Sequence, residues 1–205
     1  PRFGIETTVI DSAVDDQWEA AIRPNTKVFF FETPANPTLD IVDLRHVCDV
    51  ARAHGITTVV DNAFATSALQ RPMDFGADVV AYSATKLMDG QGRVLAGAIC
   101  GSEEWINEVL LPFQRNTGPN IAPFNAWVVL KGLETLSLRA HKQSENALED
   151  IWRQIGNGQA LFRYRVLGLC PARHASGCGY TVDQIVSQMQ TADKGELRKA
   201  CFQPA

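Results

Sequence analysis

The chain has 205 residues, of which 45% are hydrophobic and 20% charged, as expected of a globular protein with a core of its own. A net charge of −4 without a basic run argues against nucleic-acid binding, and no apolar stretch is long enough to span a bilayer. The five scattered cysteines argue against a disulfide framework and favour a reducing, cytoplasmic setting.

Predicted strands and helices alternate in the first half of the chain. Short apolar runs predict strands over residues 5–10, 27–32, 57–61, 79–83 and 95–100. Several of these runs are almost continuously apolar, which is typical of strands covered on both faces in a parallel sheet. The alternation therefore predicts an α/β fold.

Residues 40–54 are predicted to form a helix. Its apolar residues recur at spacings of three and four and predict one buried stripe, made of Leu44, Val47, Cys48 and Ala51. Asp40 is expected to cap the start of this helix, and Gly55 is expected to end it.

Helices are also predicted after the last strand. Ser102 is expected to open a helix around residues 105–111, and Pro123 to stand in the first turn of an interrupted helical region over residues 122–154. The side chains available there for burial are Trp127, Leu130, Leu133, Leu136, Ala140, Ala147 and Ile151.

The tail is broken up by glycines and carries no domain-sized apolar pattern. We therefore expect residues 1–151 to form one domain and residues 152–205 a divergent or incomplete segment. Four tail residues have a spacing that could ligate a metal: Cys170, His174, Cys178 and Cys201. They include no C-x-x-C pair, the tighter spacing usual in structural zinc sites, so we expect ordinary thiols and no metal.

Polar groups follow three consecutive predicted strands, at the ends where ligands of open α/β sheets bind. They are Glu-Thr-Pro-Ala-Asn-Pro at residues 32–37, Asp-Asn-Ala-Phe at 61–64 and Ser-Ala-Thr-Lys at 83–86. Each alone suits an ordinary loop or cap. Together they suit a pyridoxal-phosphate site, which needs a Schiff-base lysine, donors for the phosphate and a carboxylate facing the pyridine nitrogen. Lys86, the hydroxyls of Ser83 and Thr85, and Asp61 supply these groups.

The chain resembles the Cys/Met-metabolism family of pyridoxal-phosphate enzymes over residues 2–151. Four motifs carry the resemblance in order: Glu-Thr-Pro-Ala-Asn-Pro, Val-Val-Asp-Asn-Ala-Phe, Tyr-Ser-Ala-Thr-Lys, and Pro-Phe-Asn-Ala-Trp with Leu-Lys-Gly-Leu-Glu-Thr-Leu. The resemblance implies a partial large domain of the aspartate-aminotransferase type (fold type I), with a mostly parallel sheet between helices. It also implies pyridoxal 5'-phosphate as cofactor, an amino-acid substrate and a homotetramer.

The resemblance implies a role for each site residue. Lys86 corresponds to the Schiff-base lysine, which also moves protons during turnover, and Asp61 to the partner of the pyridine nitrogen. Ser83 and Thr85 correspond to phosphate ligands. Asn36 corresponds to the asparagine near the phenolic oxygen of the cofactor.

The segment after the lysine bears on the reaction. Asp-Gly-Gln-Gly-Arg at residues 89–93 is similar to O-succinylhomoserine sulfhydrylases, whereas cystathionine enzymes and lyases more often have a Gly-Gly-His type of segment. We therefore expect γ-replacement on O-succinylhomoserine by sulfide, which gives homocysteine for methionine biosynthesis. The alternatives are a cystathionine γ-synthase, a methionine γ-lyase, or a non-catalytic cofactor-binding or assembly module.

Two parts of the family pattern are not recognised in this sequence. The segment that precedes the first motif in relatives, with an aromatic that stacks on the cofactor and further phosphate ligands, is missing. After residue 151 the pattern diverges, and no arginine for the substrate carboxylate is identifiable. We therefore expect these residues alone to show little or no turnover and to expose apolar faces of the sheet.

Overall fold

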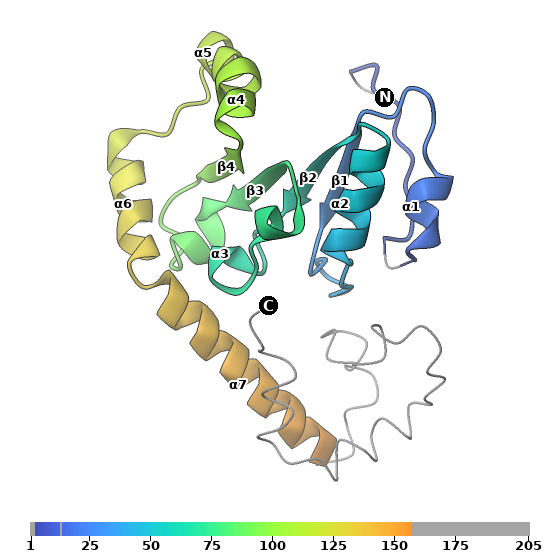
Figure 1. Ribbon diagram of the computed structural model, residues 1–205. Coiled ribbons are helices and arrows are strands. Elements are labelled where there is room, and N and C mark those ends of the chain that lie inside the picture. Colours follow the sequence, from blue (N-terminus) through green and yellow to red (C-terminus); the bar gives the residue numbers. More distant parts are fainter. Residues whose placement is uncertain (1–2, 13, 157–205) are drawn as a thin grey trace. The chain divides into compact units, whose positions relative to one another are not determined.

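A computed structural model describes residues 3–12 and 14–156 (Figure 1). The chain divides into two compact units, residues 1–147 and residues 148–205. The elements up to the turn after the third strand are α1 (Asp16–Ala20), β1 (Val28–Glu32), α2 (Leu44–Ala53), β2 (Thr57–Asp61), α3 (Thr66–Leu69), the turn η1 (Pro72–Phe75), β3 (Val79–Ser83) and the turn η2 (Ala84–Met88). They are followed by β4 (Gly97–Gly101), α4 (Glu103–Trp105), the turn η3 (Ile106–Leu110), α5 (Leu111–Thr117), α6 (Pro123–Leu133) and α7 (Leu136–Gly156).

The strands form one mixed sheet in the order β1–β2–β3–β4. β1, β2 and β3 run parallel, and β4 returns antiparallel beside β3. The last four predicted strands are therefore confirmed, as is the predicted α/β fold with a mostly parallel sheet.

The predicted strand over residues 5–10 is wrong. This segment has no regular structure, and Ile5 and Val9 are 66% and 90% exposed. Its β-branched residues suit a strand, but a strand needs a hydrogen-bonded neighbour, and in the described part of the chain β1 pairs only with β2. Side chains hold the segment instead: Asn25 Nδ2 donates a 3.1 Å hydrogen bond to Glu6 Oε2, and Ile10 packs against the core.

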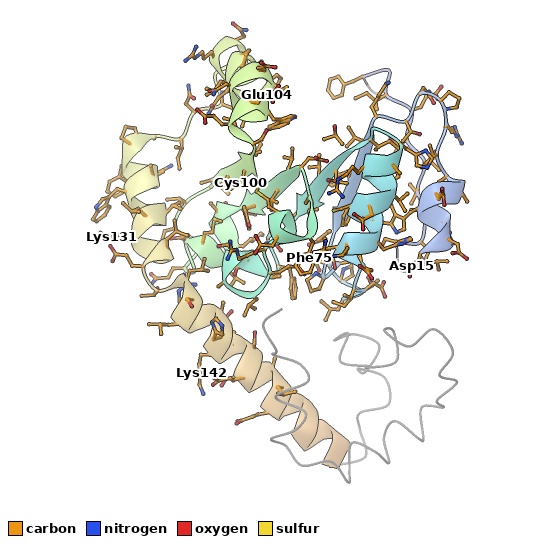
Figure 2. All side chains as sticks on the ribbon, viewed as in Figure 1. Asp15, Phe75, Cys100, Glu104, Lys131 and Lys142 are labelled. Carbon is orange, nitrogen blue, oxygen red and sulfur yellow. The ribbon has the colours of Figure 1, made fainter. Side chains whose placement is uncertain are left out.

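The core lies between one face of the sheet and helices α1 and α2. Trp18 of α1 packs against Phe29 and Phe31 of β1, with ring centroids 5.2 and 5.1 Å apart. Phe75 of η1, labelled in Figure 2, packs against the same cluster. The predicted stripe of α2 is confirmed, because all four of its residues are buried: Leu44, Val47, Cys48 and Ala51. Full burial of a leucine or valine side chain, as at Leu44 and Val47, stabilises the fold by about 1.5–3 kcal/mol.

Asp43 caps helix α2, so the prediction that Asp40 caps it is wrong. The backbone of Asp43 is extended, and its Oδ1 accepts a 3.0 Å hydrogen bond from the backbone N–H of His46. The carbonyl of Asp40 accepts a 3.0 Å hydrogen bond from Ala35 N–H, which closes the loop after β1 instead of a helical turn. Gly55 follows the helix with a φ of +64°, as predicted for a glycine that ends a helix.

The opposite face of the sheet is exposed. Alternate residues of a strand point to opposite faces, so Val28 and Phe30 point away from the core, and they are 50% and 68% exposed. Ile99 of β4 pairs with Ala81 and is 45% exposed. The prediction of strands covered on both faces is therefore wrong for β1, whereas the expected exposure of apolar sheet surface is confirmed.

The helices after β4 begin where the sequence predicts. Ser102 Oγ accepts a 3.1 Å hydrogen bond from Trp105 N–H at the start of α4, and Pro123 is the first residue of α6. The predicted helical region over residues 122–154 is divided into α6 and α7 by residues 134–135.

Burial along α6 and α7 differs in part from the prediction. Leu136 and Ala140 are buried as predicted. Four other residues of the predicted set are exposed: Trp127, Leu130, Leu133 and Ala147. For the three residues of α6 the reason is the orientation of that helix, which buries Val128 and Gly132 and contacts η2. The side chain of Ile151 lies outside the described residues.

Among the described residues, no helix is both long and apolar enough to cross a membrane. Nor do these residues include a group of three or more His, Cys, Asp or Glu side chains that could hold a metal ion. The tail residues with metal-ligand spacing lie outside the described part of the chain: Cys170, His174, Cys178 and Cys201.

Candidate functional site

The carboxyl ends of β1, β2 and β3 lie along one edge of the sheet. Glu32, the last residue of β1, pairs with Asp61, the last residue of β2, and Asp61 pairs with Ala81 of β3. Paired residues of neighbouring strands share a face, and so do residues two apart along one strand. Asp61 and Ser83 therefore project from the same face, so the structure brings these two predicted site residues together.

The Asp61 side chain is half-buried and held by its own turn. Its Oδ1 accepts a 2.9 Å hydrogen bond from the backbone N–H of Ala63, an arrangement that short acidic side chains favour after a strand. Its Oδ2 has no hydrogen-bond partner among the described residues. The carboxylate is thus oriented and keeps one oxygen available for an N–H donor.

Lys86 follows β3 within η2, and the helical turn is broken at this residue. Its φ of −83° and ψ of −119° are not helical. Around the break, Asp89 N–H donates to the Ala84 carbonyl at 2.9 Å, and Gly90 N–H donates to the Lys86 carbonyl at 2.8 Å. The side chain of Lys86 is exposed, and its Nζ has no hydrogen-bond or ion-pair partner in the described part of the chain. The backbone of Lys86 is therefore fixed while its amine is available.

The hydroxyl groups of Ser83 and Thr85 have different surroundings. Ser83 Oγ makes no hydrogen bond with the described residues. Thr85 Oγ1 accepts a 3.0 Å hydrogen bond from Ala96 N–H and donates to the Ala96 carbonyl at 3.3 Å. Thr85 thus ties η2 to the segment that leads into β4, whereas Ser83 keeps its donor free.

Asn36 lies in the loop after β1 and is exposed. Its backbone N–H donates a 3.1 Å hydrogen bond to Glu32 Oε2, which holds the loop against the end of the strand. Its side-chain amide forms no hydrogen bond within the described residues, so the structure does not link it directly to Asp61 or Lys86.

A buried amide network joins the three strand ends, and the sequence does not reveal it. Gln70 Nε2 donates to the carbonyl of Thr33 at 2.7 Å and to Asn62 Oδ1 at 2.9 Å. Asn62 Nδ2 donates to the carbonyl of Gln70 at 2.9 Å and to the hydroxyl of Tyr82 at 3.2 Å. Burial raises the pKa of the Tyr82 phenol, and the hydrogen bond from Asn62 partly offsets that rise. These contacts couple β1, β2 and β3 directly behind the residues of the site.

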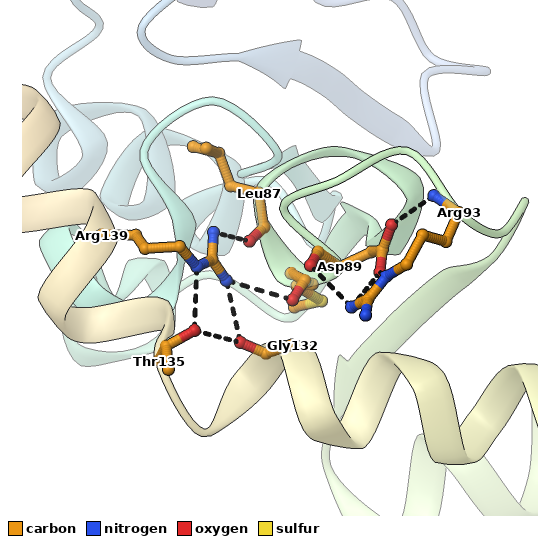
Figure 3. A network of polar contacts seen from close by, with 7 residues as sticks. Leu87, Asp89, Arg93, Gly132, Thr135 and Arg139 are labelled. Carbon is orange, nitrogen blue, oxygen red and sulfur yellow. Dashed lines mark hydrogen bonds and ion pairs between the residues drawn. The ribbon is translucent and has the colours of Figure 1, made fainter.

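The Asp-Gly-Gln-Gly-Arg segment is a closed loop held by its two ends (Figure 3). Asp89 Oδ2 accepts a 2.6 Å hydrogen bond from the backbone N–H of Arg93, and Oδ1 accepts a 2.8 Å hydrogen bond from Arg93 Nε. Gly90 and Gly92 have φ values of +78° and +66°, a conformation that favours glycine. Burial acts to raise the pKa of Asp89, but the hydrogen bonds and charge of Arg93 outweigh it, and the pKa is lowered.

Comparison with known proteins identifies the family. The profile of the family described as Cys/Met metabolism PLP-dependent enzyme matches residues 1–150. The chain belongs to this family. Its members are pyridoxal 5'-phosphate-dependent transferases and lyases of sulfur amino-acid metabolism, so the resemblance seen in the sequence over residues 2–151 is confirmed.

Curated relatives and solved structures agree with this assignment. An O-succinylhomoserine sulfhydrylase of Mycobacterium tuberculosis is 48% identical over 164 residues, which are 80% of this chain and 40% of that protein. An L-methionine gamma-lyase of Porphyromonas gingivalis is 43% identical over 148 residues, 71% of this chain and 37% of that protein. The crystal structure of cystathionine gamma-lyase from Lactobacillus plantarum complexed with L-serine superposes with a TM-score of 0.65 at 34% identity, over 67% of this chain and 36% of that chain. The chain thus spans about 40% of the length of the relatives it matches.

Asp89→Asn is expected to destabilise the protein at neutral pH but not in strong acid. Because the pKa of Asp89 is lowered from its usual 3.8 by folding, its ionised form stabilises the fold above that value. This stabilisation is lost as the pH falls through the lower pKa of the folded protein. Denaturant unfolding of both proteins at a series of pH values measures the effect.

The matched control is Asp49→Asn, which removes an exposed carboxylate from the Arg52–Asp49 ion pair and should change stability by less than about 1 kcal/mol. A difference between wild type and Asp89→Asn that stays constant from neutral pH into strong acid would contradict the assigned role of the Asp89 charge.

Proposed function

We propose that the chain provides the covalent attachment point for pyridoxal 5'-phosphate at Lys86 and the partner of the pyridine nitrogen at Asp61. The observation that supports this most is the sheet register, which aligns the end of β2 with β3 just before Lys86. The donor set also fits the cofactor: within the described residues, Lys86 offers an unpaired amine to its aldehyde and Asp61 an unpaired carboxylate oxygen to its ring nitrogen.

Ser83, Thr85 and Asn36 complete this proposal. Ser83 Oγ, which makes no hydrogen bond with the described residues, has a donor for the phosphate. Thr85 reaches the phosphate by giving up its donation to the Ala96 carbonyl, which at 3.3 Å is the longer of its two side-chain bonds. The free side-chain amide of Asn36 can donate to the phenolic oxygen of the cofactor.

We further propose that the complete enzyme exchanges the succinyl ester of O-succinylhomoserine for sulfide and releases homocysteine and succinate. When bound, the cofactor supplies an electron sink for negative charge at the substrate α carbon. The amine of Lys86, freed when substrate binds, removes the α proton and transfers protons between the substrate carbons. Asp61 keeps the ring nitrogen protonated. Succinate leaves from the γ carbon with the electrons of its C–O bond, and hydrosulfide adds at the same carbon.

The sulfhydrylase proposal is supported by relatives more than by the loop that first suggested it. Asp89 and Arg93 bind each other, so these two residues of the Asp-Gly-Gln-Gly-Arg segment hold the backbone of their own loop in place. The 48% identity to a sulfhydrylase supports γ-replacement, and the 43% identity to a methionine gamma-lyase supports γ-elimination as the second candidate.

We also propose that the complete enzyme is a cytoplasmic homotetramer. Exposed aromatic side chains on α5 and α6 support association: Phe113, Phe124 and Trp127 are 61%, 69% and 53% exposed. The ring centroids of Phe124 and Trp127 lie 5.9 Å apart, and exposed apolar surface of this kind often marks a site of protein–protein contact.

The first prediction from this function is that borohydride fixes the cofactor to Lys86. The complete protein is incubated with pyridoxal 5'-phosphate, reduced with borohydride and digested. The modified peptide should contain Lys86, because its amine is exposed and unpaired at the strand end. Lys131 is the internal control, since its Nζ is paired with Glu134 at 2.6 Å, and labelling there instead of at Lys86 would rule out the proposed attachment point.

The second prediction concerns the reaction. The cofactor-loaded complete protein should release homocysteine from O-succinylhomoserine and sulfide at a rate on the order of 10 per second, typical of enzymes. The same preparation should convert L-methionine to methanethiol far more slowly. Faster release of methanethiol would favour the lyase, and a loaded protein without turnover on either substrate would favour a non-catalytic module.

The third prediction is that Asp61→Asn lowers the turnover rate by more than about tenfold, a barrier increase above ~1.4 kcal/mol. The amide preserves the shape of the side chain but cannot hold the ring nitrogen protonated. The hydrogen bond from Ala63 N–H to the Oδ1 position can persist, so the fold should change little. Steady-state kinetics and circular dichroism of both proteins test this, and a rate within tenfold of wild type would assign Asp61 to another role.

A further inference from the structure

The guanidinium group of Arg139 is bound to the backbone that follows Lys86 (Figure 3). From the first turns of α7, Nη1 donates a 2.8 Å hydrogen bond to the carbonyl of Leu87, and Nη2 donates to the carbonyl of Met88 at 3.4 Å. Nη2 also donates to the carbonyl of Gly132 at 2.8 Å, and Nε to Thr135 Oγ1 at 3.0 Å. Within the described residues, Arg139 forms no ion pair. Its hydrogen bonds go to the backbone of residues 87 and 88 and to the end of α6 with the residue Thr135 that follows it.

The backbone after Lys86 needs such a donor. The turn is broken at Lys86, and although the Lys86 carbonyl is bound by Gly90 N–H, the carbonyl groups of Leu87 and Met88 lie at the end of the turn. Carbonyl groups at the end of a helical turn require partners from elsewhere. The planar guanidinium group can bond several oxygens at once from three nitrogens in a fixed geometry, whereas the three N–H donors of an ammonium group all come from one atom.

Helix α6 approaches the same backbone so closely that only glycine fits. A Cβ atom on Gly132 would collide with the carbonyl oxygen of Met88 and would lie 2.8 Å from the Cα atom of Asp89. A Cβ atom on Gly90 would in turn lie 2.6 Å from Cζ of Arg139. The segment after Lys86 is therefore enclosed by α6 and Arg139 on one side.

The other end of the segment is closed by the Asp89–Arg93 pair, in which the Asp89 carboxylate is fully buried. Backbone that is bound to Arg139 at residues 87 and 88 and closed at Asp89 has little freedom to rotate. The direction in which the Lys86 side chain leaves that backbone is fixed as a result.

We propose that Arg139 is a positioning residue for Lys86, which sets the orientation of the Lys86 amine without touching substrate or cofactor. The inference rests on the proposed function of Lys86. It adds to that function a residue of α7 that orients the Lys86 side chain. This residue, Arg139, lies 52 positions along the chain from Leu87.

Arg139→Lys is the test, made in the complete cofactor-loaded protein. The lysine keeps the charge but cannot form the same set of bonds, so the Lys86 amine should lose its fixed direction. We expect kcat to fall by at least about tenfold, in line with the known cost of small misplacements, while KM changes by less than about threefold. The midpoint of the pH titration of the cofactor's visible absorption band should also shift, because it reports the surroundings of the bond to Lys86.

Lys142→Gln is the matched control on the same helix. The Lys142 side chain is 69% exposed and, in the part of the chain that the structure describes, pairs only with Glu145, so its loss should leave kcat and the titration midpoint unchanged. Thr135→Val provides a second, milder variant, because it removes the oxygen that orients Arg139 Nε, and it should shift the titration midpoint in the same direction by a smaller amount. This variant decides the question if Arg139→Lys does not fold.

Each outcome bears on the proposal. A wild-type kcat and titration midpoint in Arg139→Lys, or in Thr135→Val where the first variant does not fold, would overturn it. A raised KM with unchanged kcat and spectrum would overturn it as well, since Arg139 would then contact the substrate carboxylate. Borohydride labelling of wild type keeps the two proposals distinct: absence of label on Lys86 refutes the proposed function, whereas labelled Lys86 with an unaffected variant refutes only the role of Arg139.

Discussion

The partly buried hydrogen bonds among Gln70, Asn62, Thr33 and Tyr82 are the constraint on which the candidate site depends. Asn62 and Thr33 are fully buried, so their polar groups cannot turn to water. A buried hydrogen bond contributes only about 1 kcal/mol net, but a buried polar group left without a partner costs about 1–3 kcal/mol. The network therefore discourages any shift of one strand end relative to the next. The positions of Asp61 and Ser83 relative to each other are therefore fixed by a network to which neither residue belongs.

A second constraint of another kind acts after β3. The strand ends are held by side-chain amides, whereas the segment after Lys86 is held through its carbonyl groups by Arg139 and through its loop by Asp89 and Arg93. The two constraints meet at β3, because Tyr82 belongs to the first and Lys86 follows only four residues later. The chain thus fixes its carboxylate and its lysine by separate means, and Thr85 connects the lysine segment to β4.

The sequence predicts the chemistry of the site better than its geometry, and the reason is physical. Strand ends, the stripe of α2 and the glycine after it follow from local patterns, so they could be predicted and were confirmed. The predicted strand over residues 5–10 was wrong because a strand depends on a neighbouring strand elsewhere in the chain. The cap was placed at Asp40 instead of Asp43 because the sequence pattern does not fix where a helix begins to within a few residues, and this helix begins at Leu44. Gln70 lies 37 positions from Thr33, and Arg139 lies 52 from Leu87, distances over which no local pattern extends.

The face of the sheet from which Asp61 and Ser83 project also carries Val28 and Phe30, which are exposed. Water beside a carboxylate screens its attraction for a protonated ring nitrogen, and the same attraction is several times stronger in a drier, less polar setting. Covering this face would also remove the exposed Phe30 ring from water, which is favourable by itself. Burial of the apolar sheet surface and strengthening of the Asp61 interaction are therefore coupled, because one covering layer would accomplish both.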